Sequence, residues 1–413
     1  MKILFISTRL PHEKALSGHS VVRQRIRRLI ARGYEVGLAA FEHESDAPHL
    51  AAWREELQDL ELVPLPRRPV AGKLVCRFLE KVPSRFACFY SKEMLRRIGD
   101  MVERSRYDVV IAEFAAMGQY LCSNPYLPAV RKIASVHQCY TIVSRKRLQL
   151  RSHSLSILRE WFAFKNLRNY EFHVYRDMDR VLVLTPEERF GLLNMAPDLR
   201  LSVISSGVDV EYFQPAGDVQ KEQAILFTGS YGDEPNRDAV LWFCKSIWPQ
   251  LKTRYPDLRF YVVGPGATAS MLDLQRRDPR IVITGAVDDI RPYLAKAKVF
   301  VCPVRMGSGL HGKLFESMAA GVPVVSTRLG AEGIPIQMGD NGFVADKPQI
   351  MAQQIGLLLE DEHLRESIVR NARTMVTERF SWERGVDLLE GVIHELVGPP
   401  RSQLARQTIT MPV

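Results

Sequence analysis

The sequence predicts an α/β protein built from two Rossmann-like, doubly wound domains. The chain has 413 residues, which is more than a single hydrophobic core usually accommodates. In both halves, short apolar runs alternate with longer segments of helical period, the pattern of parallel sheets covered by helices on both faces. A polar, turn-rich stretch at 205–223 has no helical period and separates the two halves.

In the first half, the expected strands are short apolar runs, each followed by a segment of helical period. An arginine-rich helix is expected between the first two strands. It ends at Gly33, because glycine readily takes the left-handed conformation that closes many helices. The predicted strands are Lys2–Ser7, Glu35–Phe41, Asp108–Phe114, Lys132–His137 and Arg180–Thr185.

The second half repeats this pattern. Its predicted strands are Ala224–Gly229, Arg259–Gly264, Arg280–Gly285, Val299–Val304 and Pro323–Thr327. We expect an N-terminal domain at 1–204, a C-terminal domain at 205–380, a helix at about 381–397 that returns to the first domain, and a flexible tail at 398–413 without a core-forming pattern.

The composition is that of a globular protein, with 46% hydrophobic and 25% charged residues. No apolar run approaches the ~18 residues that a membrane-spanning helix needs, and the opening "MKILFIST" predicts a first strand rather than a signal peptide. The six cysteines are scattered, with no CxxC pair and no Cys/His cluster at metal spacing. We therefore expect a cytoplasmic protein with reduced thiols and no metal site.

The net charge of +9 is unevenly distributed. Residues 1–200 hold 33 Lys+Arg against 22 Asp+Glu, a net charge of +11, whereas the remainder holds 23 against 25, a net charge of −2. A basic first half suggests an anionic partner, such as a membrane surface, a lipid-linked phosphate acceptor or an acidic polymer. A solvated basic surface explains the charge equally well. Nucleic acid is disfavoured because no helix-turn-helix, zinc finger or RNA-binding motif accompanies the charge.

The most informative stretch is 305–333, "RMGSGLHGKLFESMAAGVPVVSTRLGAEG". A strand leads into a glycine loop that opens a helix, an arrangement that presents backbone N–H groups and the positive end of the helix to an anion. Lys313 lies at the start of that helix, and Glu316 follows three positions later on roughly the same face. Lysine for phosphate and carboxylate for a ribose diol suit a nucleotide. Many α/β proteins have a glycine loop in this position and bind nothing there.

This segment resembles the C-terminal signature of retaining GT-B glycosyltransferases of family 4, the glycosyl transferases group 1. In that family a Glu-x7-Glu pattern spans the loop and the helix, where the second Glu binds the ribose of the donor and the first contacts the transferred sugar. Glu316 matches the second position together with the trailing "SMAAGVPVVST", whereas Ser308 occupies the first. The usual contact to a sugar hydroxyl would then fall to the loop backbone.

Other segments of the second half carry the same resemblance. In the segment 227–243, the family commonly binds the diphosphate with an Arg and a Lys. Here Ser230 takes the place of the Arg, and Arg237 lies near the place of the Lys. The segment 284–303 resembles the loop on which the base rests. The resemblance implies a donor site formed by Gly18, Gly229, Arg237, Gly285, Val287, Arg305, Gly307, Ser308, Gly309, Leu310, Lys313 and Glu316.

In the first half, Gly18 of "SGHS" follows the first strand, where the family has a glycine-rich loop facing the diphosphate. His137 comes just after a predicted strand, at the edge where open α/β sheets bind ligands. A satisfied structural histidine is the alternative for His137. The resemblance implies a role near the anomeric carbon, and Gln138 replaces the acidic residue that often follows.

The segment 144–180 is basic and aromatic at helical spacing. It suggests either an acceptor-facing or membrane-facing surface or a helix pair that buries its aromatic residues, and we favour burial. The basic side chains at its start remain candidates for binding an anionic acceptor. The aromatic residues are Trp161, Phe162, Phe164 and Phe172, and the basic ones are Arg145, Lys146 and Arg147.

The resemblance implies an enzyme that moves a sugar from a UDP- or GDP-sugar to a glycan, lipid-linked or small-molecule acceptor, with retention of anomeric configuration and without a metal or cofactor. Catalysis would involve His137, Lys313 and Arg237 in a cleft between the domains. The alternatives are a non-catalytic nucleotide-sugar-binding or scaffold protein of the same fold, and a nucleotide-sugar epimerase. The expected location is the cytoplasm, with contact to the inner face of an anionic membrane as a further hypothesis.

Overall fold

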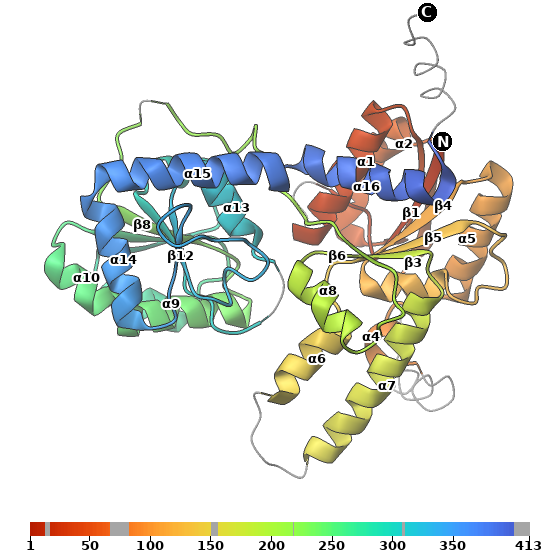
Figure 1. Ribbon diagram of the computed structural model, residues 1–413, viewed down its shortest axis with the longest axis horizontal. Helices are drawn as coiled ribbons and strands as arrows, with labels where there is room; N and C mark the ends of the chain where they lie inside the picture. Colours follow the sequence, from red (N-terminus) through yellow and green to blue (C-terminus); the bar gives the residue numbers. More distant parts are fainter. Residues whose placement is uncertain (13–16, 67–81, 150–155, 218, 308–309, 400–413) are drawn as a thin grey trace, which may run out of the picture. The chain divides into compact units, whose positions relative to one another are not determined.

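The structure is a computed structural model that describes residues 1–12, 17–66, 82–149, 156–217, 219–307 and 310–399. The chain divides into two compact units. Unit 1 contains Met1–Ser205 and the chain from Gly385 on, and unit 2 contains Ser206–Arg384. Each unit is a parallel sheet with helices on both faces (Figure 1).

Unit 1 has a seven-stranded sheet in the order β3-β2-β1-β4-β5-β6-β7, in which every pair of neighbours is parallel. A strand order that reverses next to the first strand is typical of Rossmann-like folds. The strands are β1 (Lys2–Ser7), β2 (Glu35–Glu42), β3 (Asp59–Pro64), β4 (Val109–Glu113), β5 (Arg131–Val136), β6 (Arg180–Val183) and β7 (Leu201–Val203).

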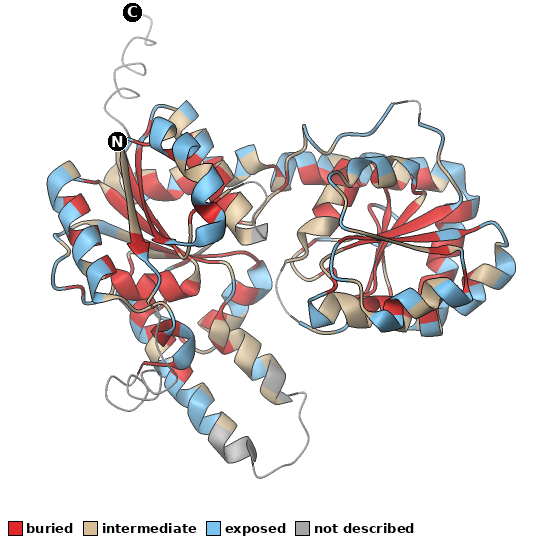
Figure 2. Cartoon of the chain, turned by 180° about the vertical axis from the view of Figure 1, so that it is seen from behind, coloured by how far each residue is buried: buried red, intermediate tan, exposed pale blue. Residues whose placement is uncertain are grey.

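Helices cover both faces of this sheet, so its central strands are buried on both sides (Figure 2). In β1, Ile3 and Phe5 belong to one hydrophobic cluster, whereas Leu4 and Ile6 belong to the cluster on the other face. The helices are α1 (Ser17–Ala31), α2 (Ala47–Glu56), α4 (Ser84–Ala87), α5 (Lys92–Ser105), α6 (Tyr140–Gln149), α7 (Ser156–Arg176), α8 (Pro186–Leu193) and α16 (Trp382–Val397), whose later turns pack on the core of unit 1.

Unit 2 repeats the design with a six-stranded parallel sheet in the order β10-β9-β8-β11-β12-β13. The strands are β8 (Ala224–Thr228), β9 (Arg259–Val263), β10 (Ile281–Gly285), β11 (Val299–Cys302), β12 (Val324–Ser326) and β13 (Phe343–Val344). The helices are α9 (Glu234–Ser246), α10 (Trp248–Arg254), α11 (Ala269–Arg277), α12 (Arg291–Lys296), α13 (Gly312–Ala319), α14 (Pro348–Glu360) and α15 (Glu362–Phe380).

The predicted α/β class with two doubly wound sheets is confirmed, and every strand predicted from the sequence is present with ends shifted by at most two residues. The prediction missed β3, β7 and β13. These strands are short or only half-buried, and they lie at or near sheet edges. They therefore lack the long apolar run that marks a central strand.

The burial predicted for the aromatic residues of α7 is partly wrong. Phe172 is buried and Phe164 is half-buried, but Trp161 and Phe162 are 48% and 64% exposed. Both lie in the first turns of α7, and α6 and α7 extend away from the sheet of unit 1 (Figure 1). Aromatic residues near the far end of this helix pair therefore have no core to join.

Candidate functional site

The glycine loop of unit 2 follows β11 and leads into α13, as the sequence predicts. Gly307 has a φ of +105°, a conformation that residues with a Cβ rarely adopt. Leu310 packs against the core of unit 2, and α13 begins at Gly312. The predicted donor contacts at Ser308 and Gly309 lie outside the described residues.

Lys313, in the first turn of α13, forms no ion pair with any residue that the structure describes. Its Nζ donates to Oδ1 of Asn236 at 2.7 Å and lies 4.4 Å from the ring centroid of Phe227. Burial lowers the pKa of Lys313 from its ordinary value. A Cβ on Gly229 would lie 3.0 Å from this Nζ, so the missing side chain of Gly229 leaves room for the amine. The arrangement suits an anion arriving from outside the protein.

Asn236 is a site residue that the sequence did not reveal. It lies in the first turn of α9, and its Nδ2 donates to the backbone oxygen of Ser230 at 2.9 Å. Asn236 thus connects the loop after β8 to the amine of Lys313. The sequence signal that could have found it is its place beside Arg237, in the turn already marked for the diphosphate.

The two arginines predicted to bind the diphosphate differ in whether their charge is already paired with a carboxylate. Arg305 donates to both carboxylate oxygens of Asp238, at 2.7 and 3.1 Å, and lies 4.8 Å from the ring centroid of Trp242. Its charge is therefore already paired. Arg237 is half-buried and makes no ion pair with any residue that the structure describes. Of the two, Arg237 is the cation more open to a ligand.

Glu316 is half-buried on α13, one helical turn after Lys313. Burial raises the pKa of Glu316, although the charge of Lys313 lowers it in part. Its carboxylate has no hydrogen bond or salt bridge within the described ranges of the chain. His311, the residue before α13, is also desolvated, and this burial together with the charge of Lys313 lowers the pKa of its imidazole to about 4. Glu316 and Nε2 of His311 thus lack hydrogen-bond partners among the described residues.

The residues predicted to contact the base lie after β10. Gly285 has a φ of +71°, and a Cβ placed on it would meet no atom within 4 Å. Val287 is partly buried against the core of unit 2. An open backbone followed by an apolar side chain can accept a flat ring such as a nucleotide base. The contact of Gly285 and Val287 with the base stays a prediction.

In unit 1, His137 follows β5 directly and contacts the carboxylate at the end of the neighbouring strand. Its Nε2 lies 2.7 Å from Oε2 of Glu113, and its ring stacks on Phe114 with centroids 4.3 Å apart. Glu113 is completely buried and also accepts from Nη1 of Arg25 at 3.0 Å. The histidine is therefore held by both a charged partner and an aromatic face.

Gly18 has a role in packing that the sequence did not predict. A Cβ on Gly18 would lie 2.8 Å from Cε1 of Phe114 and 3.3 Å from Nδ1 of His137. Phe114 itself has a φ of +74°, a strained value for a residue with a side chain. Its ring lies between His137 and His19, whose ring centroid is 4.4 Å away. Gly18 makes room for this stack, whatever it also contributes to a ligand.

Two family models match the chain. The model described as Glycosyltransferase Family 4 matches residues 19–212, and the model described as Glycosyl transferases group 1 matches residues 222–361. Together they cover most of both units. The chain belongs to the family 4, group 1 glycosyltransferases.

Curated relatives agree with this family. The chain is 33% identical over 190 residues to a phosphatidyl-myo-inositol mannosyltransferase of Mycolicibacterium smegmatis, which covers 43% of this chain and 48% of that protein. It is 26% identical over 358 residues to a D-inositol 3-phosphate glycosyltransferase of Corynebacterium glutamicum, which covers 77% of this chain and 78% of that protein. The chain spans about half the length of the first of these relatives.

A solved structure shows the same fold. HepE of Anabaena, in complex with UDP, superposes with a TM-score of 0.68 at 15% sequence identity, covering 96% of this chain and 100% of that one. At this identity the likeness concerns the fold. The two Rossmann-like units of this chain are the two halves of the GT-B architecture that the sequence predicts.

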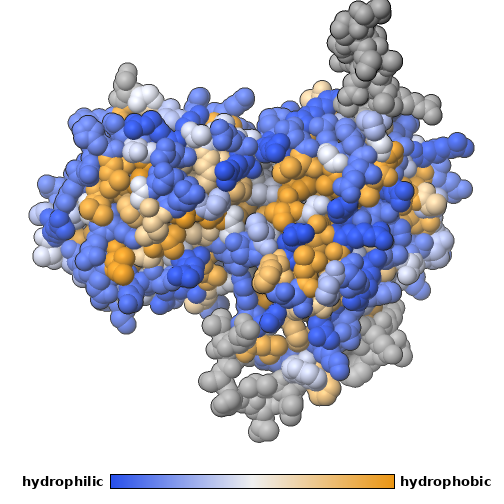
Figure 3. Space-filling model, in the orientation of Figure 1, coloured by the Kyte–Doolittle hydropathy of each residue, from blue (hydrophilic) through white to orange (hydrophobic). Residues whose placement is uncertain are grey.

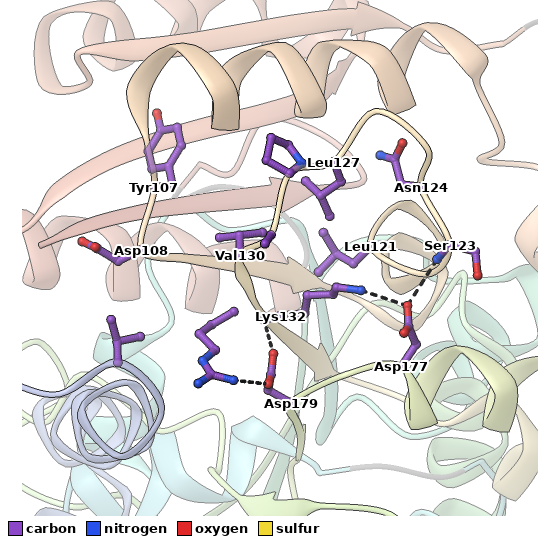
Figure 4. A pocket seen from close by; sticks show the side chains of 14 residues that line it. Tyr107, Asp108, Leu121, Ser123, Asn124, Leu127, Val130, Lys132, Asp177 and Asp179 are labelled. Carbon is purple, nitrogen blue, oxygen red and sulfur yellow. Dashed lines mark hydrogen bonds and ion pairs between the residues drawn. The ribbon is translucent and has the colours of Figure 1, made fainter.

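A pocket of about 650 Å³ lies elsewhere in unit 1 (Figure 4). It is at the amino-terminal edge of β4, β5 and β6, opposite to the edge that carries His137. Its charged groups pair with one another: Lys132 with Asp177 and Arg131 with Asp179, each at 3.0 Å. We therefore place the functional site at the carboxyl-terminal edges of the strands, where ligands of open α/β sheets bind.

Within the described ranges, no group of three or more His, Cys, Asp or Glu side chains is placed to hold a metal ion. Among those residues, too, no helix has the length and apolarity to cross a bilayer. The face of the molecule in Figure 3 mixes hydrophilic and hydrophobic residues.

Proposed function

We propose that this glycosyltransferase takes a sugar from a nucleotide-sugar donor and transfers it, with retention of anomeric configuration, to a glycan, lipid-linked or small-molecule acceptor. The observation that carries the proposal is on α13, where the amine of Lys313 and the carboxylate of Glu316 are both desolvated and neither forms an ion pair with any residue that the structure describes. A nucleotide diphosphate supplies the missing partners, phosphate for the lysine and a ribose diol for the carboxylate.

The proposed role of unit 2 is to stabilise the leaving diphosphate. Negative charge builds on the diphosphate as the glycosidic bond opens, and fixed cations and N–H groups stabilise that charge more than they stabilise the ground state. Lys313, Arg237 and the backbone after Gly307 take this role, while Glu316 holds the ribose. His137 in unit 1 orients the sugar. This mechanism calls for neither a metal nor a cofactor.

The donor is proposed to be a UDP- or GDP-sugar. A complex of HepE with UDP supports uridine, and the inositol-linked names of two relatives support a small polar or lipid-linked acceptor. A thermal-shift screen against UDP, GDP, ADP and TDP sugars identifies the base. The anomeric coupling in the proton NMR spectrum of the product tests retention, and an inverted product would refute it.

The decisive experiment is transfer or donor hydrolysis by Lys313→Ala. We expect kcat/KM to fall by about 10²–10³-fold, the range for removing one group that stabilises developing negative charge. Lys245→Ala is the matched control, because Lys245 is an exposed lysine of the same unit, in the last turn of α9. Equal activity in the two variants would contradict the proposal. A chain that binds the donor but never turns it over would be a scaffold, and one that converts the donor sugar would be an epimerase.

Contact with an anionic membrane is proposed to involve the exposed aromatic pair of α7. Trp161 and Phe162 pack against each other edge to face, and Nζ of Lys165 lies 5.4 Å from the Trp161 ring centroid. Aromatic residues beside basic ones suit the interface of an anionic bilayer. Sedimentation with anionic liposomes should be lost in Trp161→Ser/Phe162→Ser. It should persist in Phe190→Ser, which removes an aromatic residue of unit 1 that is 68% exposed on α8. Equal sedimentation of both variants would refute the contact.

A further inference from the structure

Glu113, the last residue of β4, is a buried carboxylate that the proposed reaction does not use. It accepts from Arg25 of α1 at 3.0 and 3.3 Å and lies 2.7 Å from Nε2 of His137. Arg25 also donates to Ser135 of β5 at 2.8 Å. Side chains from a helix and two neighbouring strands thus meet at one carboxylate, beside the histidine that the family resemblance places near the reacting sugar.

The contact between Glu113 and His137 determines which ring nitrogen carries the proton. Burial raises the pKa of Glu113, but the charge of Arg25 and the hydrogen bond from His137 outweigh it and hold the pKa at about 2. An ionised carboxylate only accepts hydrogen bonds, so Nε2 of His137 must be the donor. In the neutral ring Nδ1 is then the acceptor.

Packing fixes where that acceptor points. The ring of Phe114 covers one face of the imidazole, and the strained backbone of Phe114 holds it there. Nδ1 lies on the side of Gly18, 3.3 Å from where a Cβ on that glycine would be. The acceptor nitrogen therefore faces the first turn of α1, on the carboxyl-terminal side of the sheet.

A contribution to the stability of the fold does not explain why Arg25 and Glu113 form a buried ion pair. Buried ion pairs are often no more stabilising than apolar side chains of the same volume. This pair also leaves Nη2 of Arg25 buried without a hydrogen-bond partner among the residues that the structure describes. If the ion pair only stabilised the fold, we would expect Nη2 of Arg25 to have a hydrogen-bond partner. Orienting His137 requires only that Glu113 is ionised and held in a fixed place.

We infer that Glu113 is a positioning residue, which keeps the proton of His137 on Nε2 so that Nδ1 accepts a hydrogen bond from a hydroxyl group of the sugar. This inference rests on the proposed glycosyl transfer and adds Glu113 and Arg25 to the residues on which transfer depends. No proton leaves the ring: the histidine acts through a hydrogen bond whose direction the carboxylate sets.

The first test measures the tautomer without any donor. In ¹⁵N NMR spectra of the imidazole side chains of the full chain, His137 should carry its proton on Nε2. Glu113→Gln should lose this preference, because a carboxamide can donate as well as accept. In the transfer assay, the same variant should lower kcat by about 100-fold, a loss typical of a misoriented reacting group, with little change in KM for the donor. An unchanged tautomer would overturn the inference even if no sugar nucleotide proved to be a substrate.

Glu113→Gln alone leaves the charge of Arg25 buried and can fail to fold, so Arg25→Met/Glu113→Gln separates orientation from folding. This double variant removes both charges. If it unfolds at the same urea concentration as the natural protein but stays about 100-fold slow with a mixed tautomer, the inference holds. Recovery of the natural rate would overturn it. Glu56→Gln is the matched control, since it breaks an arginine–carboxylate pair of the same helix, with Arg23 at 2.7 and 2.8 Å, and should leave the rate and tautomer unchanged.

Discussion

The carboxyl-terminal edges of the two sheets have the same backbone plan but opposite electrostatics. In unit 1, Glu113 and His137 are joined to Arg25 by a chain of hydrogen bonds. In unit 2, Lys313 contacts an amide oxygen and an aromatic ring, and neither Lys313 nor Glu316 forms an ion pair among the described residues. Burial perturbs both edges, but neighbouring charges outweigh its effect on the pKa of Glu113 and only partly offset its effect on the pKa of Glu316.

This difference indicates a division of labour. Charges that satisfy one another hold a side chain in place before any ligand binds, which is what an orienting group needs. Desolvated charges without partners gain most when a ligand of opposite character arrives, which is what a binding site needs. Unit 1 is thus preorganised at its edge, and unit 2 is completed by its ligand.

The largest effect that tests this comparison is on stability. Arg25→Met leaves Glu113 buried and unpaired and should destabilise unit 1 by about 3–5 kcal/mol. Lys313→Met removes a desolvated amine that has no carboxylate partner, and it should change the stability of unit 2 by less than about 1 kcal/mol. Because two units need not unfold together, hydrogen exchange at amides of β4 and β11 measures each unit separately. Similar losses in both units would show that the comparison is wrong.

A second test uses the opposite pKa shifts of the two carboxylates. The pKa of Glu113 is held at about 2, below the ordinary 4.5. Its contribution is therefore complete above about pH 4.5 and is lost as the pH falls through about 2, at a cost of about 3 kcal/mol. The free energy of unfolding in urea, followed at β4, should therefore fall between pH 5 and pH 2. It should fall more steeply in the natural protein than in Arg25→Met/Glu113→Gln.

The pH effect has the opposite sign in unit 2. Burial raises the pKa of Glu316, so its ionised form weakens unit 2 above that pKa, and the weakening disappears as the pH falls. At pH 7, Glu316→Gln should therefore increase protection from exchange at β11 and β12, by about 1 kcal/mol or less. Exposed Glu378 on α15 offers no such gain, and Glu378→Gln is the control. Reduced protection in Glu316→Gln would mean that a partner already stabilises the carboxylate.

The sequence predicted those parts of the fold and site whose signal is local. Central strands such as β1 and β8 are continuous apolar runs because both faces of each sheet are covered, whereas β3 and β13 at the edges have no such run. Lys313 and Glu316 were found because they share one helix with the glycine loop. Glu113 and Asn236 were missed because their partners Arg25 and Lys313 lie 88 and 77 positions away in the chain. Only the fold brings such pairs together.

The last test concerns Asn236, which gives Lys313 a partner without neutralising it. Asn236→Ala should lower kcat/KM for the donor by about tenfold, the cost of losing one hydrogen bond to a charged group. Asn371→Ala is the control, because Asn371 binds Asp340 on the surface of unit 2.

Asn236→Asp makes the test sharper, because it places a carboxylate where Lys313 now has an amide. If the amine is kept unpaired for a phosphate, the new carboxylate competes with the diphosphate, and this variant should bind donor more weakly than Asn236→Ala does. It should also protect β8 from hydrogen exchange, since the lysine gains an ion pair. If Lys313 instead serves only the fold, Asn236→Asp should gain stability and keep its donor affinity, and unit 2 would then be as self-sufficient as unit 1.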